Sequence, residues 1–268
     1  MRRVSVEGAE IAYRDWGAPP GSRGGIVFVH GFLAHARWWD HVAPHFADRY
    51  HAVANDLSGM GDSGRRDTYS REQFAREILA VIRDAGLGRA TIVAHSFGSL
   101  SSLYAAKLAP ELIERVIVLD AHMFRTEAEP LSEEILPPKR YATREEALAR
   151  YRLKPPGRWP VPEVLDYVAR HSLEELAGGG WGWKFDPRIF GQINSAALRQ
   201  AVRGVTAAVD FIHAECSEVV GPEQLAAVVA NLPNCGAPVT VPLSHHHLML
   251  EQPLALIAAL DALLANPR

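Results

Sequence analysis

The hydrophobic residues of this chain occur mainly in short continuous runs, which are separated by segments with helical spacing. Continuous apolar runs of this length are typical of strands that are buried on both faces of a parallel sheet. In the first half of the chain they lie at 24–30, 50–56, 90–96 and 113–121. After an interruption the alternation resumes, with runs at 207–214 and 237–243. The order of the runs therefore predicts one sheet that is assembled from two separated parts of the chain.

Helices are predicted between these strands and after the last one. The clearest begins at Ser70, because a serine followed three residues later by a glutamine, Gln73, forms a capping box. Apolar residues then follow at helical spacing, namely Phe74, Ile78, Leu79 and Ile82. Gly86 is suited to end this helix. Alternating strands and helices predict the α/β class, with a mostly parallel, doubly wound sheet that helices cover on both faces.

Residues 123–205 break this pattern. They contain eight prolines, several charged segments with helical spacing, and no continuous apolar run. We therefore predict that they form an inserted, mainly helical cap between the two parts of a core, residues 1–122 and 206–268. The segment also holds three tryptophans, Trp159, Trp181 and Trp183. These rings favour an apolar or aromatic substrate if they contact the ligand, whereas packing of the cap itself would explain them equally well.

Composition and charge restrict the partners. The chain has 268 residues, of which 48% are hydrophobic and 22% charged, with a formal net charge of −3. This charge gives no reason to expect nucleic acid or an anionic membrane as a partner.

The sequence also contains no apolar run of signal-peptide length and no run of the ~20 apolar residues that are needed to cross a membrane. Two cysteines, Cys216 and Cys235, are too few for a disulfide scaffold, so we expect reduced thiols in a cytoplasmic protein. The oligomeric state is not predicted.

A serine stands where the third predicted strand meets its helix, in "AHSFG" (94–98). Small residues two positions before and after Ser96 permit a tight turn that exposes the serine side chain above the sheet. The backbone N–H of Phe97 would then point at a developing oxyanion, and the turn "HGF" after the first strand would supply a second donor from Phe32. The alternative is that Ser96 only caps the helix.

Five segments in order, "HGFLAHARWW", "DLSGMGDSG", "AHSFGS", "VIVLD" and "HHLMLEQP", resemble the successive landmarks of the α/β-hydrolase superfamily. The resemblance covers nearly the whole chain outside residues 123–205, where this family inserts a variable cap. It implies that Ser96 is the nucleophile and that Phe32 and Phe97 form the oxyanion hole. One departure is Ala94, which stands where the usual G-x-S-x-G pattern has its first glycine.

The segment "GMGDSG" (59–64) also matches the G-x-G-x-x-G fingerprint of dinucleotide-binding proteins. That fingerprint must open an apolar helix, but here it continues into the polar segment "RRDTYS". The resemblance gives it a structural role in a turn instead. We therefore predict no cofactor.

Three consecutive histidines, His245, His246 and His247, follow the last predicted strand, where the general base of this fold belongs. A metal site is disfavoured because neighbouring side chains point in different directions and no second ligand cluster with suitable spacing occurs. The family commonly places an acid five residues and a proline seven residues after the base. Counting back from Glu251 and Pro253 gives His246, with His247 as the second choice.

The histidine needs a carboxylate partner, and the usual position for it falls on Ser217, which cannot supply the charge. Glu215 and Glu218 lie beside it in the same loop. Some branches of the family, such as the haloalkane dehalogenases, carry the acid at the end of the strand before the cap, and that strand here ends in Asp120. We predict that Asp120 is the acid, with the two glutamates as alternatives.

A serine nucleophile disfavours the dehalogenase and epoxide hydrolase branches, which attack with aspartate. The sequence therefore predicts a hydrolase that acts through an acyl-enzyme on a small carboxylic ester, thioester or lactone. One alternative is a carbon–carbon bond hydrolase or lyase of the same fold acting on an acidic ketone, with a basic clamp from Arg37, Arg65 or Arg125. Another is a non-catalytic small-molecule binding protein on a hydrolase scaffold.

Overall fold

The computed structural model describes residues 1–124, 139–190, 193, 196–232 and 234–266, and the side chains of 196–198 are excluded from the description. Within these residues one sheet has eight strands in the order β1-β2-β4-β3-β5-β6-β9-β10. Strands from β4 to β10 in this order run parallel, whereas β2 pairs antiparallel with both β1 and β4. The predicted α/β class and mostly parallel sheet are therefore confirmed.

The strands are short and their buried positions alternate between two cores. Their bounds are β1 Arg2–Val6, β2 Ala9–Asp15, β3 Gly25–Val29, β4 His51–Asn55, β5 Ala90–His95, β6 Ile113–Leu119, β9 Ala208–Ala214 and β10 Val239–Val241. In β3, Val27 and Val29 belong to one hydrophobic cluster, while Ile26 and Phe28 belong to the other. Because successive side chains of a strand point to opposite faces, both faces of the sheet are covered.

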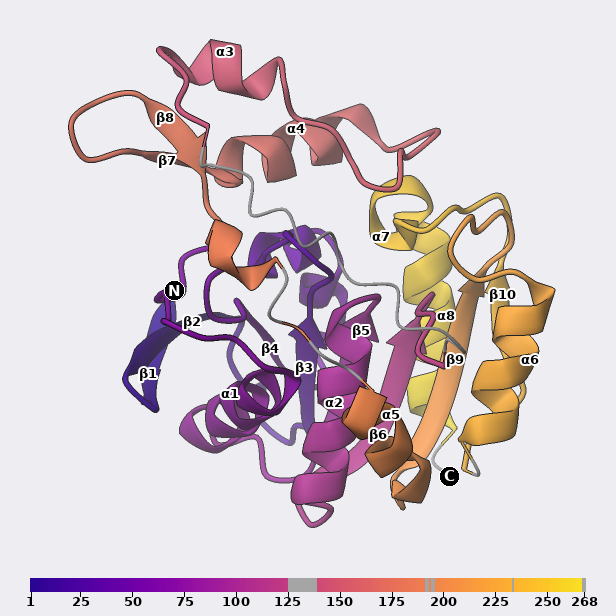
Figure 1. Cartoon of the computed structure of the whole chain (residues 1–268). Helices are drawn as coiled ribbons and strands as arrows, with labels where there is room; N and C mark the ends of the chain where they lie inside the picture. Colours follow the sequence, from indigo (N-terminus) through magenta and orange to yellow (C-terminus); the bar gives the residue numbers. More distant parts are fainter. Residues whose placement is uncertain (125–138, 191–192, 194–195, 233, 267–268) are drawn as a thin grey trace.

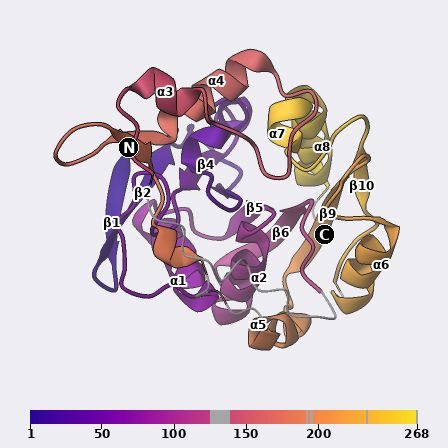
Figure 2. The ribbon, with the colours of Figure 1, turned by 45° about the horizontal axis from the view of Figure 1, so that its top comes forward.

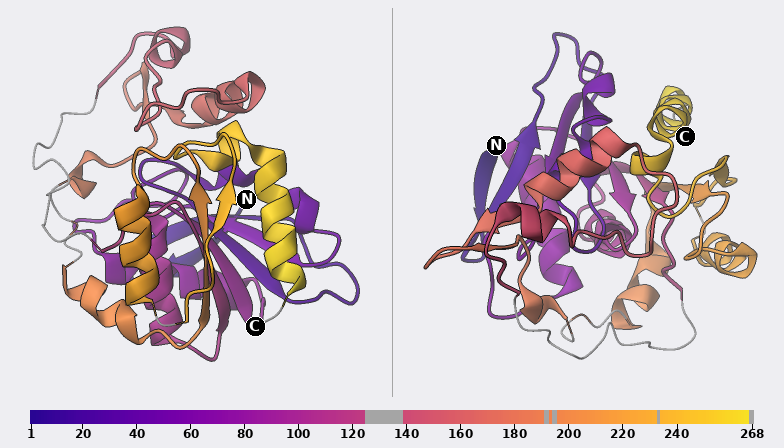
Figure 3. Two further views of the ribbon diagram at one scale, coloured as in Figure 1. Left: turned by 90° about the vertical axis from the view of Figure 1, so that its right-hand side faces the viewer. Right: turned by 90° about the horizontal axis from the view of Figure 1, so that it is seen from above.

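Helices supply the two covering layers. The helices of the core are α1 Arg71–Asp84, α2 Gly98–Leu108, α5 Ala196–Ala201, α6 Pro222–Asn231, α7 Leu248–Glu251 and α8 Pro253–Ala265. Helices α1, α2 and α6 pack on one face, and α8 packs on the other together with the 3₁₀ helices η1 Ala36–Trp39 and η2 Ala43–Phe46. Figure 3 (left) shows this division, with α6 and α8 on opposite sides of the strands.

The local signals for α1 are confirmed except for one half of the capping box, because the side-chain oxygen of Gln73 makes no return hydrogen bond to Ser70. The Ser70 hydroxyl accepts a hydrogen bond from the backbone N–H of Gln73 at 3.2 Å, as a capping residue should. At the other end, Gly86 has a φ of +67°, in the left-handed region that favours glycine after a helix. The N-terminal hairpin of β1 and β2 was not predicted from the sequence. Its two-residue turn, Glu7 and Gly8, has positive φ at both positions, as in a type I′ hairpin turn.

The segment between β6 and β9 contributes no described strand to the central sheet. It contains α3 Arg144–Leu148, α4 Pro162–His171, the short antiparallel pair β7 Leu173–Glu175 and β8 Trp181–Trp183, and the 3₁₀ helices η3 Pro187–Ile189 and η4 Val202–Gly204. The part from α3 to η3 lies over the carboxyl end of the parallel strands (Figures 1 and 2). Helix α5, in contrast, packs beside α2 in the core layer, where Lys107 donates a hydrogen bond to the Ala201 carbonyl at 2.7 Å.

Candidate active site

Ser96 occupies the turn between β5 and α2. Its φ is +48°, a left-handed conformation that costs free energy for any residue with a side chain and that is common at functional turns. Its N–H donates a hydrogen bond to the Leu119 carbonyl at 3.0 Å, which fixes the turn against the neighbouring strand β6. The side chain is half-buried at the carboxyl edge of the sheet, between strand and helix. This is the strained strand-to-helix turn that the sequence predicts.

Gly98 lies where the end of β3 leaves no room for a side chain. A Cβ at this position would lie 2.6 Å from the His30 carbonyl oxygen and 2.7 Å from a methyl group of Val29. The residues at the end of β3 therefore exclude a side chain at position 98. Gly31 is similarly crowded, because its Cβ would lie 2.7 Å from Nδ1 of His95. The two glycines let the ends of β3 and β5 approach closely.

The ring of His246 lies between Ser96 and Asp120. Its Nε2 is 2.8 Å from the Ser96 Oγ, and its Nδ1 is 2.8 Å from Oδ2 of Asp120. A carboxylate only accepts hydrogen bonds, so Nδ1 carries the proton and Nε2 accepts from the serine hydroxyl. The structure thus brings the three residues that the sequence singled out into one hydrogen-bonded row, although 126 positions separate His246 from Asp120.

Asp120 follows β6, and the pairing of the strands explains how it reaches the site. His95 of β5 is paired with Leu119 of β6, so Ser96 and Asp120 each follow the last residue of two adjacent strands. Asp120 also has a positive φ of 42°, and its side chain is fully buried. Its Oδ1 accepts the backbone N–H of Ala214 at 3.2 Å, and its Oδ2 accepts the hydroxyl of Ser217 at 2.6 Å.

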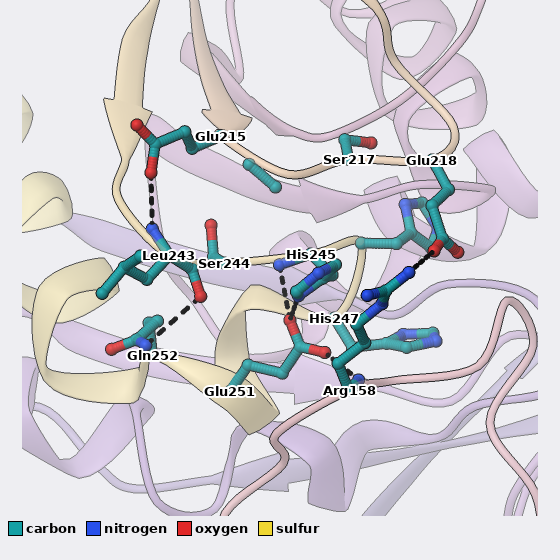
Figure 4. Close-up of polar contacts among 12 residues, drawn as sticks. Arg158, Glu215, Ser217, Glu218, Leu243, Ser244, His245, His247, Glu251 and Gln252 are labelled. Atoms are coloured by element: carbon teal, nitrogen blue, oxygen red, sulfur yellow. Dashed lines mark hydrogen bonds and ion pairs between the residues drawn. The ribbon is translucent and has the colours of Figure 1, made fainter.

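The two rival carboxylates point elsewhere (Figure 4). Oε2 of Glu215 accepts the backbone N–H of Leu243 at 2.8 Å, next to the loop that carries the histidines. Glu218 is exposed and lies 3.9 Å from the guanidinium of Arg158. Neither glutamate therefore occupies the place beside His246 that Asp120 takes.

The flanking histidines have separate partners. Nδ1 of His245 lies 3.5 Å from the buried carboxylate of Glu251, which also accepts the backbone N–H groups of His245 and Arg158. His247 donates through Nε2 to the Pro155 carbonyl at 3.0 Å. The three rings thus reach different neighbours, and within the described residues no group of His, Cys, Asp or Glu side chains has the arrangement of a metal site.

The histidines around His246 are held neutral by burial. Burial, together with a smaller effect of the nearby His246, lowers the pKa of His247 to about 3. Burial also lowers the pKa of His95 well below its usual value; its ring centroid lies 4.7 Å from that of His246. Nε2 of His95 donates to the His246 carbonyl at 2.8 Å. These two neighbours therefore add no positive charge beside the ring of His246.

Phenylalanine rings gather next to Ser96. The rings of Phe32 and Phe97 lie 4.9 Å apart, so the turn after β3 meets the start of α2 at this point. Phe190, from the segment above the sheet, packs edge-on against Phe32 at 5.3 Å. The guanidinium of buried Arg71 lies 3.8 Å from the centroid of the Phe97 ring and donates to the Phe97 carbonyl. The backbone at 97 is thereby held in place.

Two of the three tryptophans between β6 and β9 pack within that segment. The ring of Trp183 contacts Tyr141 and Tyr151 at 5.9 and 5.8 Å, and Trp181 belongs to the same small cluster. Trp159 is 63% exposed and packs edge-on against His245 at 5.4 Å. Of the three tryptophans, Trp159 thus lies beside the loop that carries the histidines.

The basic residues suggested as a clamp are engaged with carboxylates. Arg37 lies 3.9 Å from both Asp40 and Asp62, and Arg65 lies 2.7 Å from Glu174. Arg125 lies outside the described residues.

The glycine-rich segment 59–64 connects the core to the segment above it. Gly59 and Gly61 have φ values of +73° and +60°, and a Cβ on Gly61 would overlap the Asp56 carboxylate. The N–H of Gly61 donates to the Lys184 carbonyl at 2.9 Å, and Gly59 accepts from the N–H of Asp186 at 2.7 Å. In the structure this segment is a turn that binds the backbone of Lys184 and Asp186, and α1 begins only at Arg71.

Two further residues contribute to this site and were not predicted from the sequence, namely Ser217 and Arg71. Ser217 was noted only as a residue without charge at an acid position, and its contact with Asp120 joins loops that are 97 positions apart. The available signal for Ser217 was that its hydroxyl lies in the loop that also carries Glu215 and Glu218, the alternative acids. Arg71 had no distinguishing signal, because an arginine in the first turn of a helix is usually exposed.

The chain is similar in sequence and in fold to known hydrolases. The model of the alpha/beta hydrolase family matches residues 26–260. An uncharacterized hydrolase of Bacillus subtilis is 33% identical over 121 residues, which is 44% of each chain. An esterase of Mycobacterium tuberculosis is 25% identical over 262 residues, covering 94% of this chain and 85% of its own. Among solved structures, E-2-(acetamidomethylene)succinate hydrolase superimposes with a TM-score of 0.82 at 23% identity, over 99% of this chain and 98% of the other.

Proposed function

Because the chain belongs to the alpha/beta hydrolase family, we propose that it is a serine hydrolase that acts through an acyl-enzyme on a small carboxylic ester, thioester or lactone. The observation that carries this proposal is the continuous row of hydrogen bonds from Ser96 through His246 to Asp120. A serine hydroxyl is a weak nucleophile unless a base accepts its proton, and Nε2 of His246 is positioned to do so.

In the proposed first half-reaction, the Ser96 oxygen attacks the carbonyl carbon while its proton moves to Nε2 of His246. The imidazolium that forms is stabilised by Asp120, which holds the proton on Nδ1. Backbone N–H groups of Phe32 and Phe97 would donate to the oxyanion, because the two residues meet beside Ser96. His246 then returns the proton to the leaving group, and the acyl group stays on the Ser96 oxygen.

In the second half-reaction, water attacks the acyl-enzyme and gives its proton to the same nitrogen of His246. Collapse of the tetrahedral intermediate releases the carboxylic acid and restores the Ser96 hydroxyl with that proton. The neutral neighbours His95 and His247 favour this cycle, because a second positive charge beside His246 would oppose protonation of its ring.

We further propose that residues 123–205 include a cap that limits the substrate to small molecules, formed by the part from α3 to η3, and that core residues 1–122 and 206–268 carry the chemistry. The segment from α3 to η3 lies over the carboxyl end of the parallel strands, and Phe190 brings an aromatic ring to the oxyanion-hole residue Phe32. These phenylalanine rings support an apolar or aromatic acyl group. Among the described residues no helix is both long and apolar enough to span a membrane.

The test combines a substrate panel with a covalent probe. Nitrophenyl esters, thioesters, lactones and dienone acids would be assayed on the pure protein, and a fluorophosphonate would be added in parallel. We expect ester or lactone turnover, and labelling at Ser96 that disappears in Ser96→Ala. Turnover of the dienone acids alone would instead support a carbon–carbon bond hydrolase. Absence of both turnover and labelling would support a binding protein.

A further inference from the structure

We propose that Ser217 is a positioning residue of this site, which holds the Asp120 carboxylate in the orientation that His246 requires. The inference rests on the proposed function, since it assigns a role relative to the Ser96, His246 and Asp120 row. It goes beyond that function because it gives a task to a serine at the loop position where the resemblance places an acid.

The first observation is that one carboxylate oxygen serves two partners. Oδ2 of Asp120 accepts from Nδ1 of His246 at 2.8 Å and from the hydroxyl of Ser217 at 2.6 Å. A hydroxyl hydrogen bond this short to a carboxylate is of the charge-assisted kind, which is stronger than one between neutral groups. If the carboxylate rotated about its Cβ–Cγ bond, Oδ2 would leave both partners at once.

The second observation is that the hydroxyl of Ser217 has a defined direction. Its oxygen accepts the backbone N–H groups of Val219 at 3.1 Å and Val220 at 2.9 Å. A serine hydroxyl has two acceptor lone pairs and one hydrogen. With these N–H groups directed at the lone pairs, the hydrogen is left to point at Asp120. The loop after β9 therefore presents a fixed donor to the carboxylate.

The third observation concerns the other side of Asp120. Its Oδ1 accepts the backbone N–H of Ala214, the last residue of β9, at 3.2 Å. Asp120 itself has a strained φ of 42°, so its backbone alone does not favour this position. The Ala214 N–H and the Ser217 hydroxyl thus restrain both carboxylate oxygens from β9 and its loop. In this way the strand next to β6 supports an acid that β6 supplies.

The experiment measures the rate of fluorophosphonate labelling at Ser96, together with turnover of the best nitrophenyl ester. Ser217→Ala should lower kcat and the maximal labelling rate by about tenfold to a hundredfold, the range of a hydrogen bond to a charged group. KM and the half-saturating probe concentration should stay within about twofold, because the site that binds the ligand is intact. Ser217→Thr, which keeps the hydroxyl, should restore most of the rate.

Two further variants separate positioning from general damage. In the Asp120→Asn background, Ser217→Ala should cause little additional loss, because the group on which Ser217 acts has been removed. Ser244→Ala is the matched control: this buried hydroxyl donates to the Val241 carbonyl at 2.8 Å, and its loss should leave kcat within about twofold. Thermal unfolding of each variant shows whether the fold is retained.

The inference is overturned if Ser217→Ala keeps kcat within about twofold, if Ser217→Thr fails to restore the rate in a folded protein, or if the losses in Ser217→Ala and Asp120→Asn add. In each of these cases Ser96→Ala would still be inactive and unlabelled. Failure of the proposed function would look different, because the unaltered protein would then turn over no ester, thioester or lactone.

Discussion

Oδ2 of Asp120 lies 2.8 Å from Nδ1 of His246, although the aspartate follows β6 and the histidine follows β10. Strand β9 lies between these two strands in the sheet, and its loop contains the position where the resemblance implies an acid. The carboxylate therefore reaches the same imidazole nitrogen from one strand closer to Ser96. The contact between a carboxylate and His246 is therefore made from β6, and not from the loop after β9.

Asp120→Asn should lower kcat by up to about 10⁴-fold while the protein remains folded, because an asparagine can hold His246 in the wrong tautomer and cannot stabilise the imidazolium. The amide is close in size to the carboxylate, so packing should change little. Steady-state kinetics and thermal unfolding on the same preparation check this.

Glu215→Gln and Glu218→Gln are the matched controls for Asp120→Asn. Each removes one charge from the neighbouring loop, and both glutamates have partners other than His246. Both variants should keep kcat within a few-fold. A loss in either one that equals the loss in Asp120→Asn would assign the acid to that glutamate.

Ser217→Asp in the Asp120→Asn background tests whether the site can use an acid from the β9 loop. The Ser217 oxygen already lies 2.6 Å from Oδ2 of Asp120, so a longer side chain can bring a carboxylate oxygen towards Nδ1 of His246. We expect partial recovery of kcat over Asp120→Asn alone. No recovery in a folded double variant would show that this loop cannot direct a carboxylate at the base.

His246→Ala should be as inactive as Ser96→Ala, because residues that act as a unit lose nearly their whole effect when either one is removed. His245→Ala and His247→Ala should retain most of their activity. His247 bonds to the Pro155 carbonyl and not to Ser96, so its loss should affect the segment around Pro155 more than the chemistry. If His247→Ala were inactive and His246→Ala active, the base would be assigned one residue too early.

The sequence was most informative where chemistry and local backbone agree. The "AHSFG" turn, the capping signal at Ser70 and the end of α1 at Gly86 depend on a few consecutive residues, so a short window contains the whole cause. The strands of β7 and β8 were not predicted, because three residues each are too few for a periodic pattern.

Contacts between distant loops could not be predicted in the same way. The sequence offered Asp120, Glu215 and Glu218 as acids, but it does not show that Glu215 bonds to the Leu243 backbone. Nor does it show that the Ser217 hydroxyl is directed by the next residues of its loop at Asp120. Such contacts depend on the relative placement of β6, β9 and β10, which only the packed sheet determines.

Stability should fall as the pH is lowered from about 6.5 towards 4. Burial lowers the pKa of His30 to about 4 and that of His35 and His247 to about 3. In the unfolded chain these histidines titrate near ~6.5, so in this window the unfolded state binds more protons and gains free energy. Each histidine contributes stabilising free energy that is fully present above about pH 6.5. On acidification this free energy is lost at up to about 1.4 kcal/mol per pH unit.

Two buried acids oppose this trend. Burial raises the pKa of Asp56 to about 6 and raises that of Glu77 above its usual value, so protonation of these groups on acidification favours the folded state. The three histidines outnumber these two acids, and urea midpoints should therefore be lower at pH 5 than at pH 7. His35→Gln should reduce this difference, whereas His45→Gln, at an exposed position, should leave it unchanged. A midpoint that is equal or higher at pH 5 would contradict the buried neutral histidines.

Limited proteolysis should cut residues 139–190 first at Gly178–Gly179, the exposed tip of the β7–β8 hairpin. Both glycines have positive φ values, and exposed glycine-rich tips are the backbone that a protease accommodates most readily. Segment 154–161 should resist, because the Pro155 carbonyl accepts from His247 and the Val161 N–H donates to Leu250 at 2.7 Å. A protease of broad specificity with mass spectrometry of the early fragments identifies the cut. The nicked protein should stay associated through the hairpin ladder and keep Ser96 labelling. An earlier cut within 154–161 would show that this segment is not held to the loop that carries the histidines.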